Sequence, residues 1–375
     1  MPRAGAVPRK KVVFPHLDGL RFFCFLAVFL FHAFHTDASQ IKQSEAYRVA
    51  RQLVRHGDLG VNFFFVLSGF LITYLLLEEK RWCGEIHIGY FYLRRILRIW
   101  PLYMACIALG FLGFPVLKQA VGLEPSETAN PIMYLLFLGN FDVISNGLPD
   151  AGILGVLWSV AVEEQFYFVW PILLAAVPLG RELWILLSIL ATSLIFRAIQ
   201  TNDAVLTFHT AGLIGDMAVG GLAAYASIRS GSFVEWVAGA RGAALWLLYG
   251  LTALVFFLDS RFLRPFDRLV PAIVFAAVIL EQNYSRASPF KAGAFPLLSR
   301  LGQRTYGMYC LHMVGNVAAI QLARSLGLGG AVWHVLLAIP LTSLTITLLI
   351  SELSYRYFEL RFLGWKSRFQ FISRE

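Results

Sequence analysis

Long apolar stretches of close to 20 residues recur along the whole chain and alternate with short polar segments. About 20 consecutive apolar residues let an α-helix cross a bilayer, whereas a soluble helix keeps one polar face. The pattern therefore predicts an all-α protein, a polytopic membrane bundle of about ten transmembrane helices. The predicted spans are residues 17–36, 59–78, 98–116, 154–178, 183–199, 208–228, 243–260, 268–283, 304–323 and 331–353.

Composition supports this class. The 375 residues are 58% hydrophobic and only 15% charged, against about 25% charged in ordinary soluble domains. The apolar run that follows the basic N-terminus is long and has no small-residue cleavage site, so we expect it to stay in place as the first span. Residues 131–144 are apolar but interrupted by polar residues, and we expect a surface-lying or re-entrant piece there.

The distribution of Lys and Arg orients the bundle. With the N-terminus in the cytoplasm, the inner segments and span ends carry about twice as many Lys and Arg as the outer ones, as the positive-inside rule requires. We predict one domain over 1–375, with a basic cytoplasmic N-terminus (1–16), a bundle (17–355) and a basic cytoplasmic tail (356–375), in the cell membrane. This topology explains the net charge of +9 and gives no indication of nucleic acid.

Two ionisable residues lie inside the first span. Arg21 and His32 are eleven positions apart, so they project from one helix face about 16 Å apart along its axis. Ionisable residues within a span are costly to bury and indicate a functional site by default. The four cysteines lack paired spacing, so we predict neither a disulfide framework nor a metal site.

Four further patterns interrupt the apolar background. GVNFFFVLSGFLIT (60–73) contains Ser68, and FYLRRILRIWPLY (91–103) contains Arg94, Arg95 and Arg98. LWSVAVEEQFYFVWPIL (157–173) brings Glu163 and Glu164 into an apolar helix, and YGMYCLHMV (306–314) places His312 in the ninth span.

These patterns follow the sequence LDGLR, which has a histidine eleven residues after its arginine. In this order they resemble the acyltransferase-3 family of integral membrane acyltransferases. The resemblance covers nearly the whole chain. It implies transfer of an acyl group, usually acetyl, from cytoplasmic acyl-coenzyme A to a saccharide hydroxyl of lipopolysaccharide, exopolysaccharide or a related glycan. Acetyl-coenzyme A would be the co-substrate, and the saccharide and membrane lipids the other partners.

Two positions depart from the family pattern. Its Ser-Leu-Ser is Ser159-Val160-Ala161 here, and its C-terminal Glu-x-Pro is Glu359-Leu360-Arg361. We expect these departures to alter local packing or acceptor preference.

Each candidate residue has a functional and a structural interpretation. A neutral imidazole at His32 can act as a general base on an acceptor hydroxyl, or it can bridge two helices by hydrogen bonds. Arg21 can hold a coenzyme A phosphate or polarise the thioester carbonyl, or it can form an ion pair with Asp18. His35, near the outer surface, is expected on the acceptor side.

The remaining candidates carry the same ambiguity. Glu163 is expected to orient the His32 imidazole, as carboxylates do in acyl-transfer triads, or to pair with an arginine. The cluster Arg94, Arg95 and Arg98 suits coenzyme A phosphates or lipid headgroups. We expect Ser68 with Gly69 to serve helix packing, and His312 to be mainly structural.

A non-catalytic transporter or flippase of a lipid-linked saccharide is the alternative to the acyltransferase. Transporters often contain inverted repeats and broken helices, and the sequence has no such internal symmetry. The acceptor, the acyl chain length and the oligomeric state do not follow from the sequence.

Overall fold

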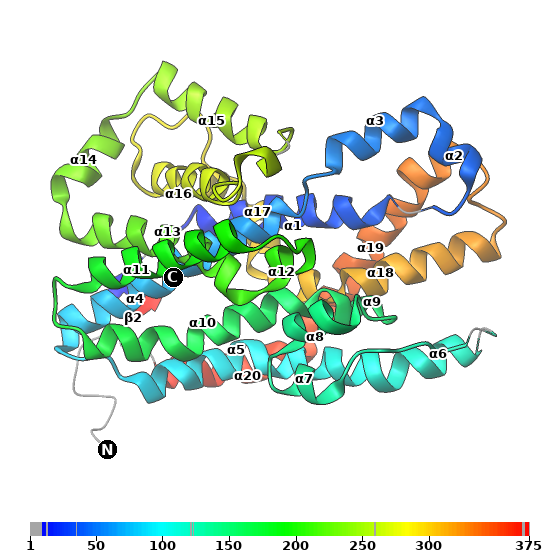
Figure 1. The fold of residues 1–375 in the computed structure, drawn as a ribbon, viewed down its shortest axis with the longest axis horizontal. Helices are drawn as coiled ribbons and strands as arrows, with labels where there is room; N and C mark the ends of the chain where they lie inside the picture. Colours follow the sequence, from blue (N-terminus) through cyan, green and yellow to red (C-terminus); the bar gives the residue numbers. More distant parts are fainter. Residues whose placement is uncertain are drawn as a thin grey trace.

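The computed structural model describes residues 10–12, 14–34, 36–120, 122, 124–258, 260–369 and 372–374. Within them the protein is helical apart from two three-residue strands, β1 (Lys10–Val12) and β2 (Ile372–Arg374). Most long helices run along the long axis of the view in Figure 1. The predicted all-α membrane bundle is confirmed.

The helices have the following bounds. The first part of the chain forms α1 (Leu17–Ala33), α2 (Ser39–Gln43), α3 (Glu45–Val54), α4 (Leu59–Cys83), α5 (Ile88–Ala108), η1 (Leu109–Gly113), α6 (Phe114–Ala120), α7 (Pro131–Leu135), α8 (Gly139–Asn146), α9 (Gly152–Gly155) and α10 (Leu157–Ala176). The rest forms α11 (Glu182–Ile199), α12 (Asp203–Phe208), α13 (Thr210–Arg229), α14 (Gly231–Gly239), α15 (Ala243–Val255), η2 (Ser260–Leu263), α16 (Leu269–Tyr284), η3 (Ala292–Ala294), α17 (Pro296–Gln303), α18 (Thr305–Ser325), η4 (His334–Ala338), α19 (Ile339–Ser354), η5 (Tyr355–Glu359), α20 (Leu360–Lys366) and η6 (Ser367–Phe369).

Each of the ten predicted spans overlaps one or more of these helices. In the described part of the chain, six continuous helical segments are long and apolar enough to cross a membrane, or seven if α14 and α15, bent by 90°, form one span. The difference from ten arises partly from length, because α1 and α16 have 17 and 16 residues. The interrupted segment 131–144 forms the short helices α7 and α8.

The two strands bring the ends of the chain together. They pair in parallel, with Lys10 opposite Ile372 and Val12 opposite Arg374. The segments before α1 and after α20 therefore lie side by side at one end of the bundle, which we call the strand end; α2 and α3 lie at the opposite, far end (Figure 1). This agrees with the prediction that both termini share one compartment.

Helices α4 and α13 pack with their backbones in direct contact. A Cβ atom built on Gly220 would lie 1.9 Å from the carbonyl oxygen of Val66, and one built on Gly69 would lie 2.0 Å from that of Met217. Small residues permit such close approach between membrane helices. The predicted packing role of Gly69 is confirmed.

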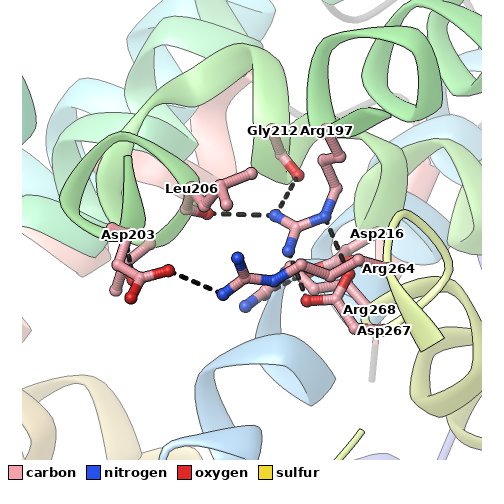
Figure 2. Close-up of polar contacts among 9 residues, drawn as sticks. Arg197, Asp203, Leu206, Gly212, Asp216, Arg264, Asp267 and Arg268 are labelled. Atoms are coloured by element: carbon pink, nitrogen blue, oxygen red, sulfur yellow. Dashed lines mark hydrogen bonds and ion pairs between the residues drawn. The ribbon is translucent and has the colours of Figure 1, made fainter. Parts of the chain in front are cut away.

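A buried network of arginines and aspartates connects α11, α12 and α13 with the segment before α16 (Figure 2). Arg197 of α11 binds Asp267 through two nitrogens at 3.0 and 2.5 Å, and it also donates to the carbonyls of Leu206 and Gly212. Arg268 pairs with Asp216 of α13. The planar guanidinium fork suits such bidentate pairing, which links α11, α12 and α13 to the segment before α16.

The α4–α13 contact gives a stability prediction. Gly220→Ala should lower the melting temperature of the detergent-solubilised protein, because the new methyl group meets a backbone carbonyl that no rotamer change can move. Gly250→Ala is the matched control, since a Cβ there meets nothing within 4 Å and Ala favours the helix by about 1 kcal/mol. Fluorescence-detected thermal unfolding measures both; equal melting temperatures would contradict the packing.

Candidate active site

A cavity of about 630 Å³ lies at the strand end of the bundle. Helices α1, α4, α5, α10, α17 and α18 and the C-terminal segment 355–366 line it, and its volume suits a small organic ligand. Five of the six predicted site residues line this cavity: Arg21, Arg94, Arg95, Arg98 and Glu163. The sixth, His32, does not.

Arg94 is committed to structural partners at the cavity wall. Its Nη2 lies 3.1 Å from Oε2 of Glu79, and its Nη1 donates to the carbonyl of Phe369 at 2.7 Å. Both Arg94 and Glu79 are buried. This arginine therefore ties α5 to α4 and to the C-terminal segment.

Arg95 is held differently. Its guanidinium lies over the rings of Phe91 and Tyr167, 5.5 and 5.4 Å from their centroids. Its Nε is buried and has no hydrogen-bond partner in the part of the chain that the structure describes. Two aromatic faces thus fix the cation in place, and because Arg95 lines the cavity while its Nε is buried, its terminal nitrogens are the donors that face a ligand there.

Arg21 forms the ion pair that its spacing allows. Its Nη1 lies 2.6 Å from Oδ1 of Asp18, one turn earlier on α1. Both side chains also line the cavity. The pair adds one cation and one anion to the lining of the cavity.

Glu163 lies at a polar centre within the cavity. Its Oε1 accepts a hydrogen bond from Ser68 at 2.7 Å, and its Oε2 accepts one from Tyr167 at 3.3 Å. No hydrogen bond joins Glu163 and His32 among the described residues, so the orienting role expected of Glu163 has no direct contact behind it. Glu163 interacts electrostatically with Arg21, which lies about three turns from His32 along α1. The sequence reasoning also missed that Ser68 faces Glu163.

His32 lies toward the far end and contacts a second histidine. Its Nδ1 donates to the carbonyl of Val28 at 2.9 Å and lies 3.4 Å from Nε2 of His312 on α18. His32 thus bridges two helices, as its structural interpretation expected, and it is partly exposed. We call His32 and His312 the histidine pair. His35 lies outside the described residues.

A layer of aromatic side chains separates the cavity from the histidine pair. Phe25 follows Arg21 by one turn on α1, is fully buried, and contacts the His312 ring edge-on at 6.3 Å between centroids. Tyr309 lines the cavity, and its carbonyl contacts His312 on the other side. From Phe25 to His32 the helix rises about 10 Å.

The rim of the cavity at the strand end carries His16, next to the lining residue Pro15. Burial lowers the pKa of His16, and the nearby charge of Lys291 lowers it further. Its imidazole is therefore mostly neutral at pH 7, and the positive charge at this end comes from arginine and lysine side chains. Among the described residues, no group of three or more His, Cys, Asp or Glu side chains could hold a metal ion.

Comparison with known proteins assigns the class. A family profile described as an acyltransferase domain matches residues 14–352, which contain the histidine pair and most of the cavity lining. The chain belongs to the acyltransferase-3 family of integral membrane proteins.

Two curated relatives come from Staphylococcus aureus. The protein named "Putative O-acetyltransferase SAR0937" of strain MRSA252 is 24% identical over 395 residues, covering 97% of this chain and 61% of the relative. "O-acetyltransferase OatA" of strain NCTC 8325 / PS 47 is 30% identical over 167 residues, covering 43% of this chain and 24% of the relative. The chain thus spans about three fifths of the length of the first relative. No solved structure matches it significantly.

The partners of Glu163 can be tested without measuring activity. In a double-mutant cycle on unfolding, Ser68→Ala and Glu163→Gln should show a coupling of roughly 0.5–3 kcal/mol, because the two side chains share a hydrogen bond. Glu163→Gln and His32→Phe, the control pair, should be additive within about 0.5 kcal/mol. Coupling in the control pair and additivity in the first pair would contradict this arrangement.

Proposed function

We propose that this chain is a membrane O-acyltransferase that moves an acetyl or short acyl group from cytoplasmic acyl-coenzyme A to a hydroxyl of a cell-surface or lipid-linked saccharide, such as a lipopolysaccharide sugar. The observation that carries the proposal is the cavity lined by Arg21, Arg95 and Arg98, in which the rings of Phe91 and Tyr167 hold the Arg95 cation in place. The printed names of the relatives support transfer of acetyl groups to oxygen.

The cavity suits the donor. Coenzyme A is an anion with several phosphate groups, and guanidinium groups bind phosphate oxygens in a fork geometry. Arg95, with Arg98 and Arg21 in the same wall, would hold these phosphates at the strand end. The positive-inside rule favours a cytoplasmic position for this end, and acyl-coenzyme A is found in the cytoplasm. The thioester arm then extends along the cavity toward Tyr309.

His32 suits the acceptor side. In the proposed reaction its neutral Nε2 takes the proton of the saccharide hydroxyl as the oxygen attacks the thioester carbonyl. The carbon–sulfur bond then breaks, and the coenzyme A thiolate leaves and takes up a proton. For the reactants to meet, the layer at Phe25 moves aside. While closed, this layer keeps acceptor-side water away from the thioester.

The first test separates an enzyme from a flippase. Purified wild-type protein in liposomes should consume radiolabelled acetyl-coenzyme A only when envelope glycan from a strain lacking the gene is supplied. His32→Ala should insert normally and bind the donor but lose transfer by about 10²–10⁴-fold, the usual contribution of a general base. A wild-type rate of transfer by this variant would show that His32 is not the general base. If acetyl-coenzyme A is never consumed, the flippase is favoured.

The second test concerns Arg95. Arg95→Gln should raise the KM for acetyl-coenzyme A by about 10- to 100-fold and leave kcat close to wild type, because a charge-assisted contact with the donor is worth about 1.5–3 kcal/mol.

Two controls accompany this variant. Arg241→Gln removes an exposed loop cation outside the cavity and should leave the KM unchanged. Arg94→Gln breaks the buried pair with Glu79 and should lower the melting temperature. Equal effects of Arg95→Gln and Arg241→Gln on the KM would indicate lipid headgroup binding in place of donor binding.

A further inference from the structure

We propose that His312 is a positioning residue for the acyl transfer. It would hold the His32 imidazole with its proton on Nδ1, leave Nε2 free to accept the hydroxyl proton, and stabilise the imidazolium that forms. This inference rests on the proposed function, because it assigns His312 a role toward the proposed base.

The backbone fixes the proton of His312. Its Nδ1 lies 2.6 Å from the carbonyl oxygen of Tyr309, three residues earlier on α18. A carbonyl oxygen can only accept, so Nδ1 must carry the hydrogen. In a neutral imidazole the other nitrogen is then an acceptor. The lone pair of His312 Nε2 therefore faces His32.

The same argument applies to His32. Its Nδ1 lies 2.9 Å from the carbonyl oxygen of Val28 and 3.4 Å from His312 Nε2. Both neighbours are acceptors, so one N–H on His32 Nδ1 satisfies both. The remaining nitrogen, Nε2, is then the lone-pair atom. It has no hydrogen-bond partner among the described residues, and it is not among their fully buried polar atoms.

The pair thus supplies the two properties that a general base needs. Its acceptor nitrogen is open to a substrate, and its other nitrogen is held by two acceptors. When His32 Nε2 takes a proton, the positive charge spreads over the imidazolium ring. His312 Nε2 and the Val28 carbonyl then accept a stronger hydrogen bond from Nδ1–H and so stabilise this charge. This is the task that a carboxylate performs beside histidine in acyl-transfer triads. The charges of Asp58 and Arg51 also act on His32 from its exposed side.

The packing keeps His312 in this orientation. Its side chain is fully buried, and the rings of Phe25 and Tyr309 lie 6.3 and 5.9 Å from its ring. The imidazole therefore cannot turn its Nε2 toward water. Its position is set by α18, whereas that of His32 is set by α1.

Two substitutions of His312 distinguish positioning from packing. His312→Phe keeps an aromatic ring in the core but removes the acceptor, and His312→Gln keeps an acceptor oxygen but buries an amide. With acetyl-coenzyme A and the glycan fraction used for the wild type, His312→Phe should lose on the order of 10- to 100-fold in kcat. The KM for acetyl-coenzyme A should stay unchanged. His312→Gln should recover part of this loss although it melts at a lower temperature.

The outcomes decide between the roles. A higher rate for His312→Gln than for His312→Phe, together with a lower melting temperature for His312→Gln, supports positioning. Wild-type kcat in His312→Phe, or rates that fall only in proportion to folded protein, would overturn it. If His32→Ala retains transfer, the base itself is refuted; if His32→Ala is inactive while His312→Phe is fully active, only the positioning role fails.

A readout that needs no turnover completes the test. In ¹⁵N-histidine spectra, with His32 identified by its loss in His32→Ala, the wild type should show His32 as the Nδ1–H tautomer. His312→Phe should shift the Nδ1 resonance of His32, because the Nδ1–H then donates to the Val28 carbonyl alone. An unchanged His32 spectrum in that variant would contradict the proposed control by His312.

Discussion

The structure depends on one constraint, that charged groups inside an apolar bundle must find their partners within the protein. Unpaired charge in a low-dielectric interior is costly, and breaking a buried pair is strongly destabilising. Arg197 with Asp267 and Arg94 with Glu79 satisfy this constraint completely. Arg95 does not, since ring faces replace hydrogen bonds around it. An incompletely satisfied cation that opens on a cavity distinguishes a ligand site from a structural network.

The polar groups form two centres on either side of the Phe25 layer. The arginines, Ser68 and Glu163 surround the cavity at the strand end, and the histidine pair lies toward the far end. This separation suits a reaction whose substrates arrive from opposite sides of a membrane. In the proposed reaction, an aromatic layer between the centres would keep water from a thioester that waits for its acceptor.

Local features of the fold were predictable from the sequence. Each of the ten apolar runs overlaps a helix, and the three-residue spacing of Asp18 and Arg21 allowed their ion pair. The partners of Glu163 and His32 were not predictable in the same way. Ser68 precedes Glu163 by 95 residues and His312 follows His32 by 280, so these contacts depend on how the helices pack. Without that packing, a triad analogy led from His32 to Glu163.

The choice of partner for His32 follows from the same constraint. A carboxylate beside a buried imidazole would be a permanent charge that needs its own compensation throughout the catalytic cycle. His312 is neutral when its Nδ1 donates to Tyr309, so it adds no charge to the resting site. A positive charge then exists only while His32 holds the acceptor proton. Glu163 can remain in the cavity because the charges of Arg95 and Arg21 act on it there. Permanent charges thus collect where the anionic donor would bind, and the transient charge arises where the hydroxyl would be activated.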